Sequence, residues 1–320
     1  MPRYKNVHLF VIDGQNDFCN SGNEPANYPV PAGGQRKGAL YVDGADQEAE
    51  NLASFIKETA TGSQTNLIKQ VHATLDSHHE NDCAHNTTWK DQNGNTPDPF
   101  TIVSEESVQK HEFTPVFQTG IWEGQIISPH QWALGYTKRL KEEGRNPLTL
   151  WPQHCLIQGW GASIYHPLQE AYSAWTSKTG GWIDFITKGQ WPFTEHYSPW
   201  RADVIDSTRP ETQLNAGTLS QAGNCDLAIW SGWAGSHCLK WDGVDGVGFF
   251  EPDQADKDKG AVNEFVKKCV FVSDASAPVP NPPFPNAPDF AQWRVDFLND
   301  MSNRGAQVLT LNETLRLLAS

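Results

Sequence analysis

Short apolar runs recur along the chain, and each has the length of a buried strand. They lie at 7–12, 71–75, 184–188, 227–232, 268–274 and 307–311. Continuous apolar runs of this length are typical of parallel sheets covered on both faces. Segments with helical periodicity separate them, at 44–61, 130–143, 161–178, 212–222 and 291–302, and Asn312 is expected to cap a last helix. The alternation predicts an α/β fold: a doubly wound, mainly parallel six-stranded sheet with helices on both faces.

The segment from about 87 to 147 interrupts this alternation. It has few strand signals, several turns and one amphipathic helix. We therefore expect a single domain over residues 1–320, with an insertion at about 87–147 that covers the site. Segments 20–44 and 278–288, rich in glycine, proline or asparagine, are predicted as irregular loops. The chain has no internal repeat, no glycine-rich phosphate loop and no dinucleotide-binding fingerprint.

Composition restricts the partners of the chain. A net charge of -14 and a pI near 5.1 argue against nucleic acid and against anionic membranes, because both require clustered lysine and arginine. The sequence shows neither a signal peptide nor about 18 consecutive apolar residues, so we expect a cytoplasmic protein whose six cysteines are reduced thiols. The composition excludes neither small uncharged or cationic substrates nor a homo-oligomer.

Three reactive side chains follow the ends of predicted strands. Asp13 follows the first strand, Lys188 ends the third, and Cys238 lies just beyond the fourth, in the first turn of a helix. Because parallel strands bring their carboxyl ends to one edge, the three should meet there. A thiol at a helix N-terminus is predicted to ionise readily, with Asp13 as a base and Lys188 as a charge partner. Each residue also has a structural interpretation, as a turn residue, a solvated charge or a buried apolar thiol.

A cluster of metal-ligand residue types follows the second strand. Asp76 and His78 lie two apart and point the same way, while His85 can fold back across the loop and His154 can complete the set. Mixed carboxylate and imidazole ligands suit zinc or ferrous iron in an open, catalytic site. His79 should point away. A solvated, histidine-rich loop is the alternative interpretation.

Several motifs outside the insertion resemble the nicotinamidase and isochorismatase-like cysteine hydrolases. They are Val-Ile-Asp13-Gly-Gln-Asn-Asp-Phe18, Asp76-Ser-His78, Trp151-Pro-Gln-His154-Cys, Lys188-Gly, Gly232-Trp-Ala234-Gly-Ser-His-Cys238, and Gly305-Ala-Gln-Val with Glu313. The resemblance implies a triad of Asp13 as base, Lys188 as charge partner and Cys238 as nucleophile. It also implies a non-proline cis peptide bond before Ala234, with the backbone N–H groups of Ala234 and Cys238 forming an oxyanion hole. Cys238 argues against an isochorismatase proper.

The resemblance further implies an aromatic substrate pocket. Phe18, Trp151 and Tyr197 are similar in position to residues that enclose a ring, and we place Trp233 and His237 in the same pocket. Trp233 is bulky for its position and could narrow the site. The helix that begins near Cys238 is expected to be short, because it contains two glycines.

These observations predict metal-assisted hydrolysis of a small amide, with nicotinamide converted to nicotinate and ammonia through a cysteine thioester. The metal is a divalent ion, zinc or iron, with zinc favoured, and it would anchor the pyridine nitrogen. Two alternatives stay open. One is a related hydrolase that acts on another small amide or carbamoyl compound, and the other is a non-catalytic metal-binding protein on the same fold. The identity of the substrate is left open because the insertion is expected to cover the site.

Overall fold

The structure of the chain is a computed structural model that describes residues 4–23, 37–61, 67–285 and 287–320. Of the predicted loop 20–44, residues 24–36 lie outside this description, as does residue 286 of the proline-rich segment. Within the described ranges, no helix is both long enough and apolar enough to span a bilayer.

Six parallel strands form the central sheet, in the order β12-β11-β10-β1-β2-β9. Their bounds are Val7–Ile12 for β1, Ile68–Asp76 for β2, Ile183–Lys188 for β9, Leu227–Gly232 for β10, Cys269–Val272 for β11 and Gln307–Leu309 for β12. The chain builds outward from β1 through β2 to β9, then returns to β10 on the other side of β1. The predicted doubly wound parallel sheet is confirmed. Its strand order reverses between β1 and β10, which is where such sheets bind ligands.

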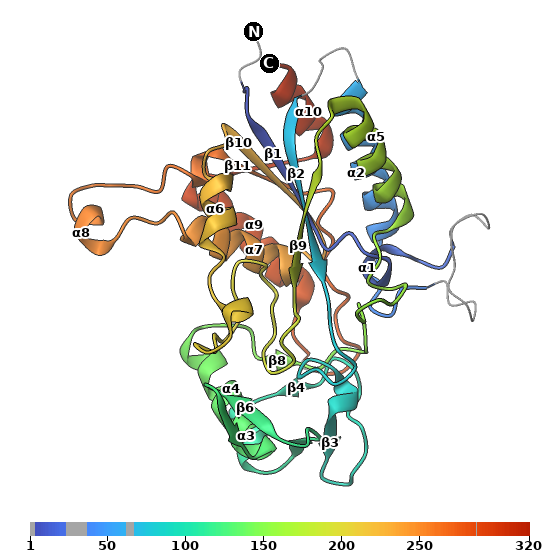
Figure 1. The fold of residues 1–320 in the computed structure, drawn as a ribbon, viewed down its shortest axis with the longest axis vertical. Coiled ribbons are helices and arrows are strands. Elements are labelled where there is room, and N and C mark those ends of the chain that lie inside the picture. The colour runs from blue at the N-terminus through green and yellow to red at the C-terminus, as the bar shows by residue number, and fades with distance from the viewer. Residues whose placement is uncertain (1–3, 24–36, 62–66, 286) are drawn as a thin grey trace.

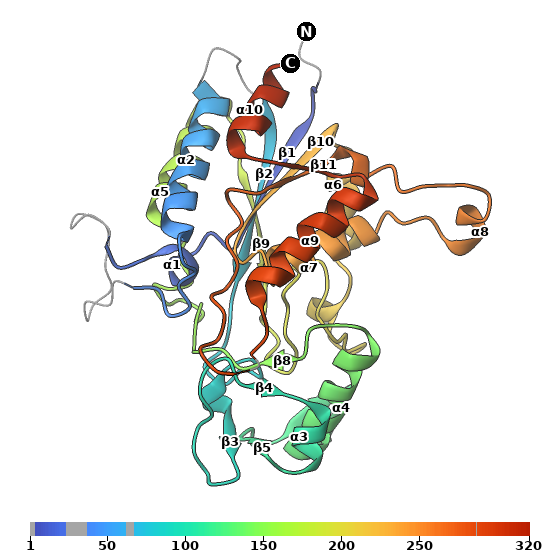
Figure 2. The same cartoon turned by 180° about the vertical axis from the view of Figure 1, so that it is seen from behind.

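Helices cover both faces of the sheet (Figures 1 and 2). One face carries α2 (Ala45–Thr61), α5 (His166–Thr179) and α10 (Leu311–Ala319), and the other carries α6 (Ala216–Ala222), α7 (Cys238–Gly248) and α9 (Phe290–Arg304). The described residues also contain two four-residue helices, α1 (Asn16–Cys19) and α8 (Gln254–Lys257), and three 3-10 turns, Asn86–Thr88, Pro210–Thr212 and Val266–Lys268.

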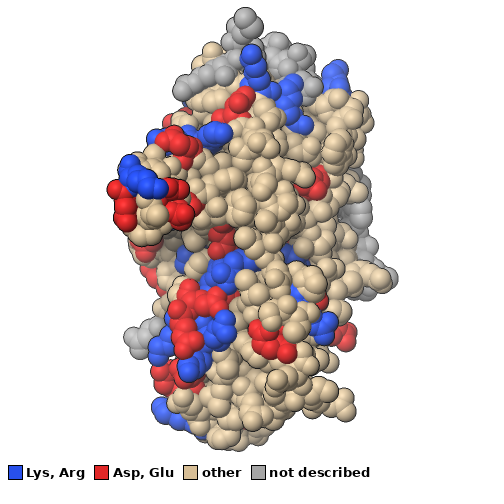
Figure 3. Space-filling view, turned by 60° about the vertical axis from the view of Figure 1, so that its left-hand side comes forward, with Lys and Arg blue, Asp and Glu red and all other residues tan. Residues whose placement is uncertain are grey.

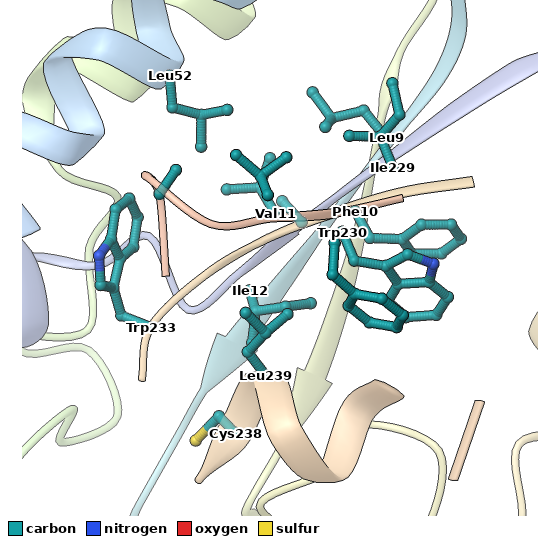
Figure 4. Close-up of a cluster of buried hydrophobic side chains, with 14 of the residues drawn as sticks. Leu9, Phe10, Val11, Ile12, Leu52, Ile229, Trp230, Trp233, Cys238 and Leu239 are labelled. Atoms are coloured by element: carbon teal, nitrogen blue, oxygen red, sulfur yellow. The ribbon is translucent and has the colours of Figure 1, made fainter. Parts of the chain in front are cut away.

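Side chains of β1 alternate between the two helical layers. Figure 4 shows Val11 on the side of Leu52 of α2, and Ile12 on the side of Leu239 of α7. All four side chains are buried. Because β1 is covered on both faces, its sequence reads as a continuous apolar run rather than an alternating one.

The last helix is capped differently from the prediction. Its N-cap is Thr310, whose hydroxyl accepts the Glu313 N–H at 3.2 Å while the Glu313 carboxylate accepts the Thr310 N–H at 2.8 Å. The predicted Asn312 cap is wrong, because this reciprocal pair satisfies both free N–H groups two residues earlier.

Helix α7 is longer than its glycines suggested. It spans 11 residues, and the expectation of a short helix is wrong. A Cβ on Gly243 would lie 2.8 Å from Phe271, and one on Gly246 would lie 3.0 Å from Trp230. The glycines therefore let α7 approach the sheet closely, and packing outweighs their low helix propensity.

Residues of the predicted insertion form a lobe beyond the carboxyl ends of the strands (Figure 1). The lobe contains α3 (Glu105–Gln109), α4 (Pro129–Glu142) and three two-stranded ribbons: β3 (Trp89–Asp91) with β5 (Phe113–Pro115), β4 (Ile102–Val103) with β8 (Leu148–Thr149), and β6 (Gly120–Trp122) with β7 (Gln125–Ile127). Its apolar side chains form a second buried cluster around Trp132, which Phe193 and Val204 complete from the β9–β10 connection. The lobe is thus packed against that connection.

Charged side chains of both signs are mixed over the surface. On the face drawn in Figure 3, the Lys and Arg residues that the structure describes are interspersed with Asp and Glu and form no broad positive patch. This distribution accompanies the net negative charge of the chain.

Candidate active site

Four side chains from strand ends meet where the strand order reverses. Asp13 follows β1, Asp76 ends β2, Lys188 ends β9 in register with Asp76, and Cys238 begins α7 after β10. The Lys188 Nζ lies 2.9 Å from Asp13 Oδ2, 2.9 Å from Asp76 Oδ1 and 3.6 Å from Cys238 Sγ. All four residues are buried, so the ammonium lies between two carboxylates and a thiol out of contact with bulk water.

The charges of this group depend on one another. Burial disfavours the Lys188 ammonium, but Asp13 and Asp76 outweigh burial and raise the pKa of Lys188 well above its ordinary value. Burial also disfavours the Asp76 carboxylate, yet His78 and Lys188 hold its pKa well below the ordinary value. For Asp13, burial dominates and raises the pKa, while Lys188 opposes the rise. Lys188 is therefore protonated beside Asp13, whose own pKa is raised while that of Asp76 is lowered.

Thr74 holds the Asp13 carboxyl group in place. Its hydroxyl donates to Asp13 Oδ1 at 2.6 Å and accepts the Asp13 backbone N–H at 3.0 Å. The Gln15 side chain makes a similar double contact with the backbone of Asp76, donating to its carbonyl and accepting its N–H, each at 2.8 Å. Sequence reasoning missed both residues. The spacing of Thr74 and Asp76, which puts them on one side of β2, was the available signal for Thr74.

The Cys238 thiol is neutral rather than readily ionised. Cys238 does occupy the first turn of α7, with His237 at the N-cap. However, burial raises the pKa of the thiol well above its ordinary value, and Lys188 only partly opposes this; a hydrogen bond to Asp13 raises it further. The prediction of a readily ionising thiol is wrong, because burial destabilises the thiolate more than the nearby Lys188 ammonium stabilises it.

The turn between β10 and α7 carries Ala234 and leads into Cys238, the two residues of the predicted oxyanion hole. Its Trp233–Ala234 peptide bond is cis, and the Ala234 carbonyl accepts the N–H groups of His237 at 3.0 Å and Leu239 at 3.1 Å. Within the described part of the chain, the N–H groups of Ala234 and Cys238 have no hydrogen-bond acceptor. These are the two donors that the predicted oxyanion hole requires.

Asp76, His78 and His154 form a group with the geometry of a metal site. One potential ligand atom from each lies within 4.8 Å of the others, and all three residues are buried. Asp76 Oδ2 is 3.0 Å from His78 Nε2 and 3.3 Å from His154 Nε2. The other ring nitrogens also have oxygen partners: Asp82 Oδ2 lies 3.1 Å from His78 Nδ1, and the Pro152 carbonyl lies 2.9 Å from His154 Nδ1. Oxygen partners on the far nitrogen are typical of metal-binding histidines, since they fix the ring and its tautomer.

His85 lies beside this group without joining its three ligand atoms. Its ring centroid is 5.1 Å from that of His78 and 5.4 Å from that of His154, and the Glu80 carbonyl lies 3.3 Å from its Nδ1. Burial, and then the neighbouring histidines, lower the pKa of His85 to about 3, so the ring is neutral as a ligand must be. Its role as a ligand stays a prediction. His79 is exposed.

This donor set suits zinc or ferrous iron. It combines one carboxylate with two imidazoles and contains no thiolate. Sequence reasoning missed Asp82, the oxygen partner of His78, although its position four residues after that histidine was visible in the sequence.

Aromatic side chains from three parts of the chain surround His237. Ring centroids lie 5.0 Å from His237 for Trp151, 5.2 Å for Tyr197, 4.7 Å for Phe290 and 5.5 Å for Trp293. The Trp151 indole N–H donates to the Tyr197 hydroxyl at 3.2 Å. Three predicted pocket residues are therefore brought together, and α9 adds two more that no local sequence signal indicated.

The remaining predicted pocket residues lie apart from this aromatic group. Phe18 is buried with its ring edge-on to His154, at 5.5 Å between centroids. The Trp233 indole donates to Glu48 of α2 at 2.9 Å and points away from the Cys238 sulfur (Figure 4). Trp233 thus packs against a helix on the other side of the turn rather than narrowing the space around the thiol.

The thiol itself is almost closed off. Cys238 is 6% exposed, and three well-defined cavities of about 650, 480 and 390 Å³ have neither Cys238, Asp13 nor Lys188 in their walls. The largest of them lies between α5 and β9. The candidate site is therefore defined by the convergence of its side chains rather than by any of these three cavities.

No protein-family model matches this chain, and no curated protein sequence matches it. Solved structures do. A nicotinamidase and pyrazinamidase from Acinetobacter baumanii is 16% identical over 98% of this chain and 99% of its own, with a TM-score of 0.54. The yeast nicotinamidase is 13% identical over 95% of this chain and 99% of its own, with a TM-score of 0.53, or 0.55 when bound to the inhibitor nicotinaldehyde. The chain therefore has the α/β fold of these nicotinamidases.

Proposed function

We propose that this chain is an amidohydrolase that cleaves the C–N bond of a small amide, nicotinamide in particular, through a thioester on Cys238. The observation that carries the proposal is the position of Lys188, with its ammonium within 3.6 Å of the Cys238 sulfur and 2.9 Å of the Asp13 carboxylate. A nucleophile, a base and a fixed cation are the groups that amide cleavage by a cysteine requires.

The first half of the reaction forms the thioester. Asp13 takes the thiol proton as the Cys238 sulfur attacks the amide carbonyl carbon and a C–S bond forms. The Ala234 and Cys238 N–H groups stabilise the oxyanion. Asp13 then gives its proton to the amide nitrogen, the C–N bond breaks, and ammonia leaves. The raised pKa of Asp13 suits this exchange, because the carboxyl must hold the proton briefly and release it.

The second half of the reaction returns the thiol. Asp13 takes a proton from water, whose oxygen attacks the thioester carbonyl, and the oxyanion is stabilised as before. The C–S bond then breaks, the acid is released, and the sulfur recovers the proton from Asp13. Lys188 stays protonated throughout, since two carboxylates hold its pKa high despite burial.

We further propose that Asp76, His78 and His154 hold a divalent metal, zinc in preference to iron, with His85 as an additional ligand. When bound, this ion supplies a Lewis-acidic anchor for an acceptor atom of the substrate, such as a pyridine nitrogen. Phe18 packs beside His154, and the aromatic group around His237 gives a flat ring several surfaces to pack against. These residues orient and enclose the substrate, whereas bond breaking belongs to Cys238 and Asp13.

Ammonia release from metal-loaded protein tests the proposal. We expect turnover of nicotinamide that a chelator removes and that Cys238→Ala abolishes. Cys225→Ala, a buried thiol near the opposite ends of the strands, is the matched control and should retain activity. Mass spectrometry of acid-quenched protein should show the acyl group on Cys238. Full turnover by Cys238→Ala would refute the thioester.

A different small amide is the second candidate substrate, and the lobe favours it. Trp151, which lines the aromatic group, directly follows the lobe strand β8 and Leu150 of the lobe's own apolar cluster. The lobe thus helps to position a member of the aromatic group around His237. A panel of aromatic, aliphatic and carbamoyl amides, assayed with and without chelator, separates the candidates. If metal-loaded protein hydrolyses none of them, both enzyme proposals are wrong and a non-catalytic metal-binding protein is favoured.

A further inference from the structure

Arg145 joins the lobe to the helix that carries Cys238. It follows α4 at the end of the lobe, and its side chain is only 3% exposed. The guanidinium Nη2 donates to both carboxylate oxygens of Asp245 in α7, at 2.9 and 3.0 Å. The guanidinium carbon also lies 4.3 Å from the ring centroid of Trp241, one turn earlier in α7. One side chain therefore contacts α7 in two ways, through an ion pair with Asp245 and by stacking on Trp241.

The same guanidinium faces the connection between β9 and β10. Its Nη1 lies 3.6 Å from Asp203 Oδ1, and the Asp203 carboxylate is buried. The Asp203 backbone N–H donates to the Glu195 carbonyl at 2.8 Å, which closes a loop over residues 195–203. Tyr197, a member of the aromatic group around His237, lies within this loop. Arg145 thus contacts the loop that presents Tyr197 as well as the helix that presents Cys238.

Buried charge makes these contacts dependent on one another. Burial raises the pKa of Asp203 to about 8, with Arg145 opposing the rise, and burial raises the pKa of Asp245 with Arg145 again opposing it. Without the guanidinium, two buried carboxyl groups from different segments would lose their shared cation. Removing the guanidinium would leave the Asp245 carboxylate without its ion-pair partner, and breaking a buried ion pair in this way is strongly destabilising.

A second lobe residue repeats the connection. The Asn146 side-chain oxygen accepts from Lys240 Nζ at 3.2 Å, and this ammonium also lies 5.0 Å from the Trp241 ring and 5.2 Å from the Trp293 ring. Trp293 belongs to the aromatic group around His237. The end of the lobe is therefore tied to α7 and, through Lys240, to the start of α9.

We propose that Arg145 is a positioning residue. It fixes the position of α7, which carries Cys238, relative to the loop that carries Tyr197. The placement of both therefore depends on the packing of the lobe against them. We call Arg145, Asp203, Trp241 and Asp245 the arginine clasp. The chemistry calls for arginine, because a planar guanidinium can stack on an indole and bind carboxylates on its edge at the same time. A lysine at this position would keep the charge but lose the stacking and the paired hydrogen bonds.

Hydrogen exchange of the full-length protein tests the clasp without reference to catalysis. Arg145→Met should speed amide exchange about tenfold in both the 195–204 loop and α7, and Arg145→Lys should give a smaller increase. Lys138→Met is the matched control, since this lysine lies in the same lobe, pairs with Glu142 at 3.7 Å and is 59% exposed. Unchanged exchange in the loop and α7 of a folded Arg145→Met protein would overturn the proposal, as would faster exchange in the lobe alone.

Kinetics test the positioning role, and this arm rests on the proposed function. At equal concentrations of folded active sites, counted by Cys238 titration, Arg145→Met should lower kcat at least threefold, with partial rescue by Arg145→Lys. A purely structural role would reduce the folded fraction and leave kcat per site unchanged, and that result overturns the proposal. Should Arg145→Met fail to fold, Asp245→Asn breaks the same contact more mildly and should lower kcat in the same direction. If the wild type hydrolyses no amide, hydrogen exchange alone decides the inference.

Discussion

Replacing Thr74 with valine should impair the Asp13 base while leaving the shape of the core unchanged. Threonine and valine are nearly isosteric, so the change removes only the hydroxyl that donates to Asp13 Oδ1 at 2.6 Å and accepts the Asp13 N–H at 3.0 Å. Thr74 and Asp13 are both fully buried, so water cannot replace either hydrogen bond without rearrangement.

The magnitude follows from these two bonds. A hydrogen bond to a charged group contributes about 1.5–3 kcal/mol, and an unpaired buried N–H costs about 1–3 kcal/mol. We therefore expect Thr74→Val to lower the free energy of unfolding by about 3–5 kcal/mol at neutral pH. Because the lost bond favoured the carboxylate, the pKa of Asp13 should rise further.

The sign of the pH dependence follows from this shift. Burial already raises the folded pKa of Asp13 above its ordinary 3.8, and the substitution raises it further without changing the unfolded chain. Below 3.8, Asp13 is protonated in both states and the ionic part of the destabilisation is absent. That part grows as the pH rises and is complete above the variant's folded pKa. Because catalysis needs the Asp13 carboxylate, the acid limb of the kcat/KM profile should move to higher pH.

Denaturant unfolding and the pH profile of ammonia release measure the two effects. Thr59→Val is the matched control, because Thr59 is equally buried and its hydroxyl donates to the Ile56 carbonyl of the same helix at 3.0 Å. The control should lose less than about 1 kcal/mol and keep the wild-type profile. The reasoning is refuted if Thr74→Val loses no more stability than Thr59→Val, or if its acid limb coincides with that of the wild type.

Three further predictions concern packing, metal affinity and capping. Gly243→Ala should destabilise the protein by about 1–2 kcal/mol, because its Cβ would meet two phenylalanine rings at 2.8 and 2.9 Å. Gly248→Ala in the same helix meets nothing within 4 Å and should be neutral or stabilising, and thermal unfolding compares the two variants. Asp82→Asn should weaken zinc binding about 10- to 100-fold in a chelator competition, since His78 loses its oriented carboxylate, and unchanged affinity would exclude this role. Thr310→Ala should cost about 1 kcal/mol in denaturant unfolding, and no loss would contradict the capping box.

Positions at strand ends were predictable from the sequence, and with them most of the candidate site. Apolar runs of strand length placed Asp13, Asp76 and Lys188 at the ends of buried strands. A parallel sheet brings such ends to one edge whatever the connecting segments do. Local patterning therefore sufficed for three of the charged groups that meet at the thiol.

Residues that hold these groups in place were not predictable in the same way. Thr74 contacts Asp13 across 61 positions of sequence, and Arg145 contacts Asp245 across 100. No periodicity marks such a pair, because each partner is an ordinary polar residue within its own segment. Their roles arise only when distant segments pack together and exclude water between them.

The turn that carries Cys238 shows which features follow from the sequence and which depend on the tertiary structure. The sequence by itself determined that a buried strand breaks at Gly232 and that Cys238 enters a helix, since apolar runs and small turn residues are local signals. Only the tertiary structure decided that the thiol is neutral and that the Trp233 indole turns towards α2. The physical reason is that ionisation and side-chain direction depend on desolvation and on the surrounding packing, and both exist only in the folded chain.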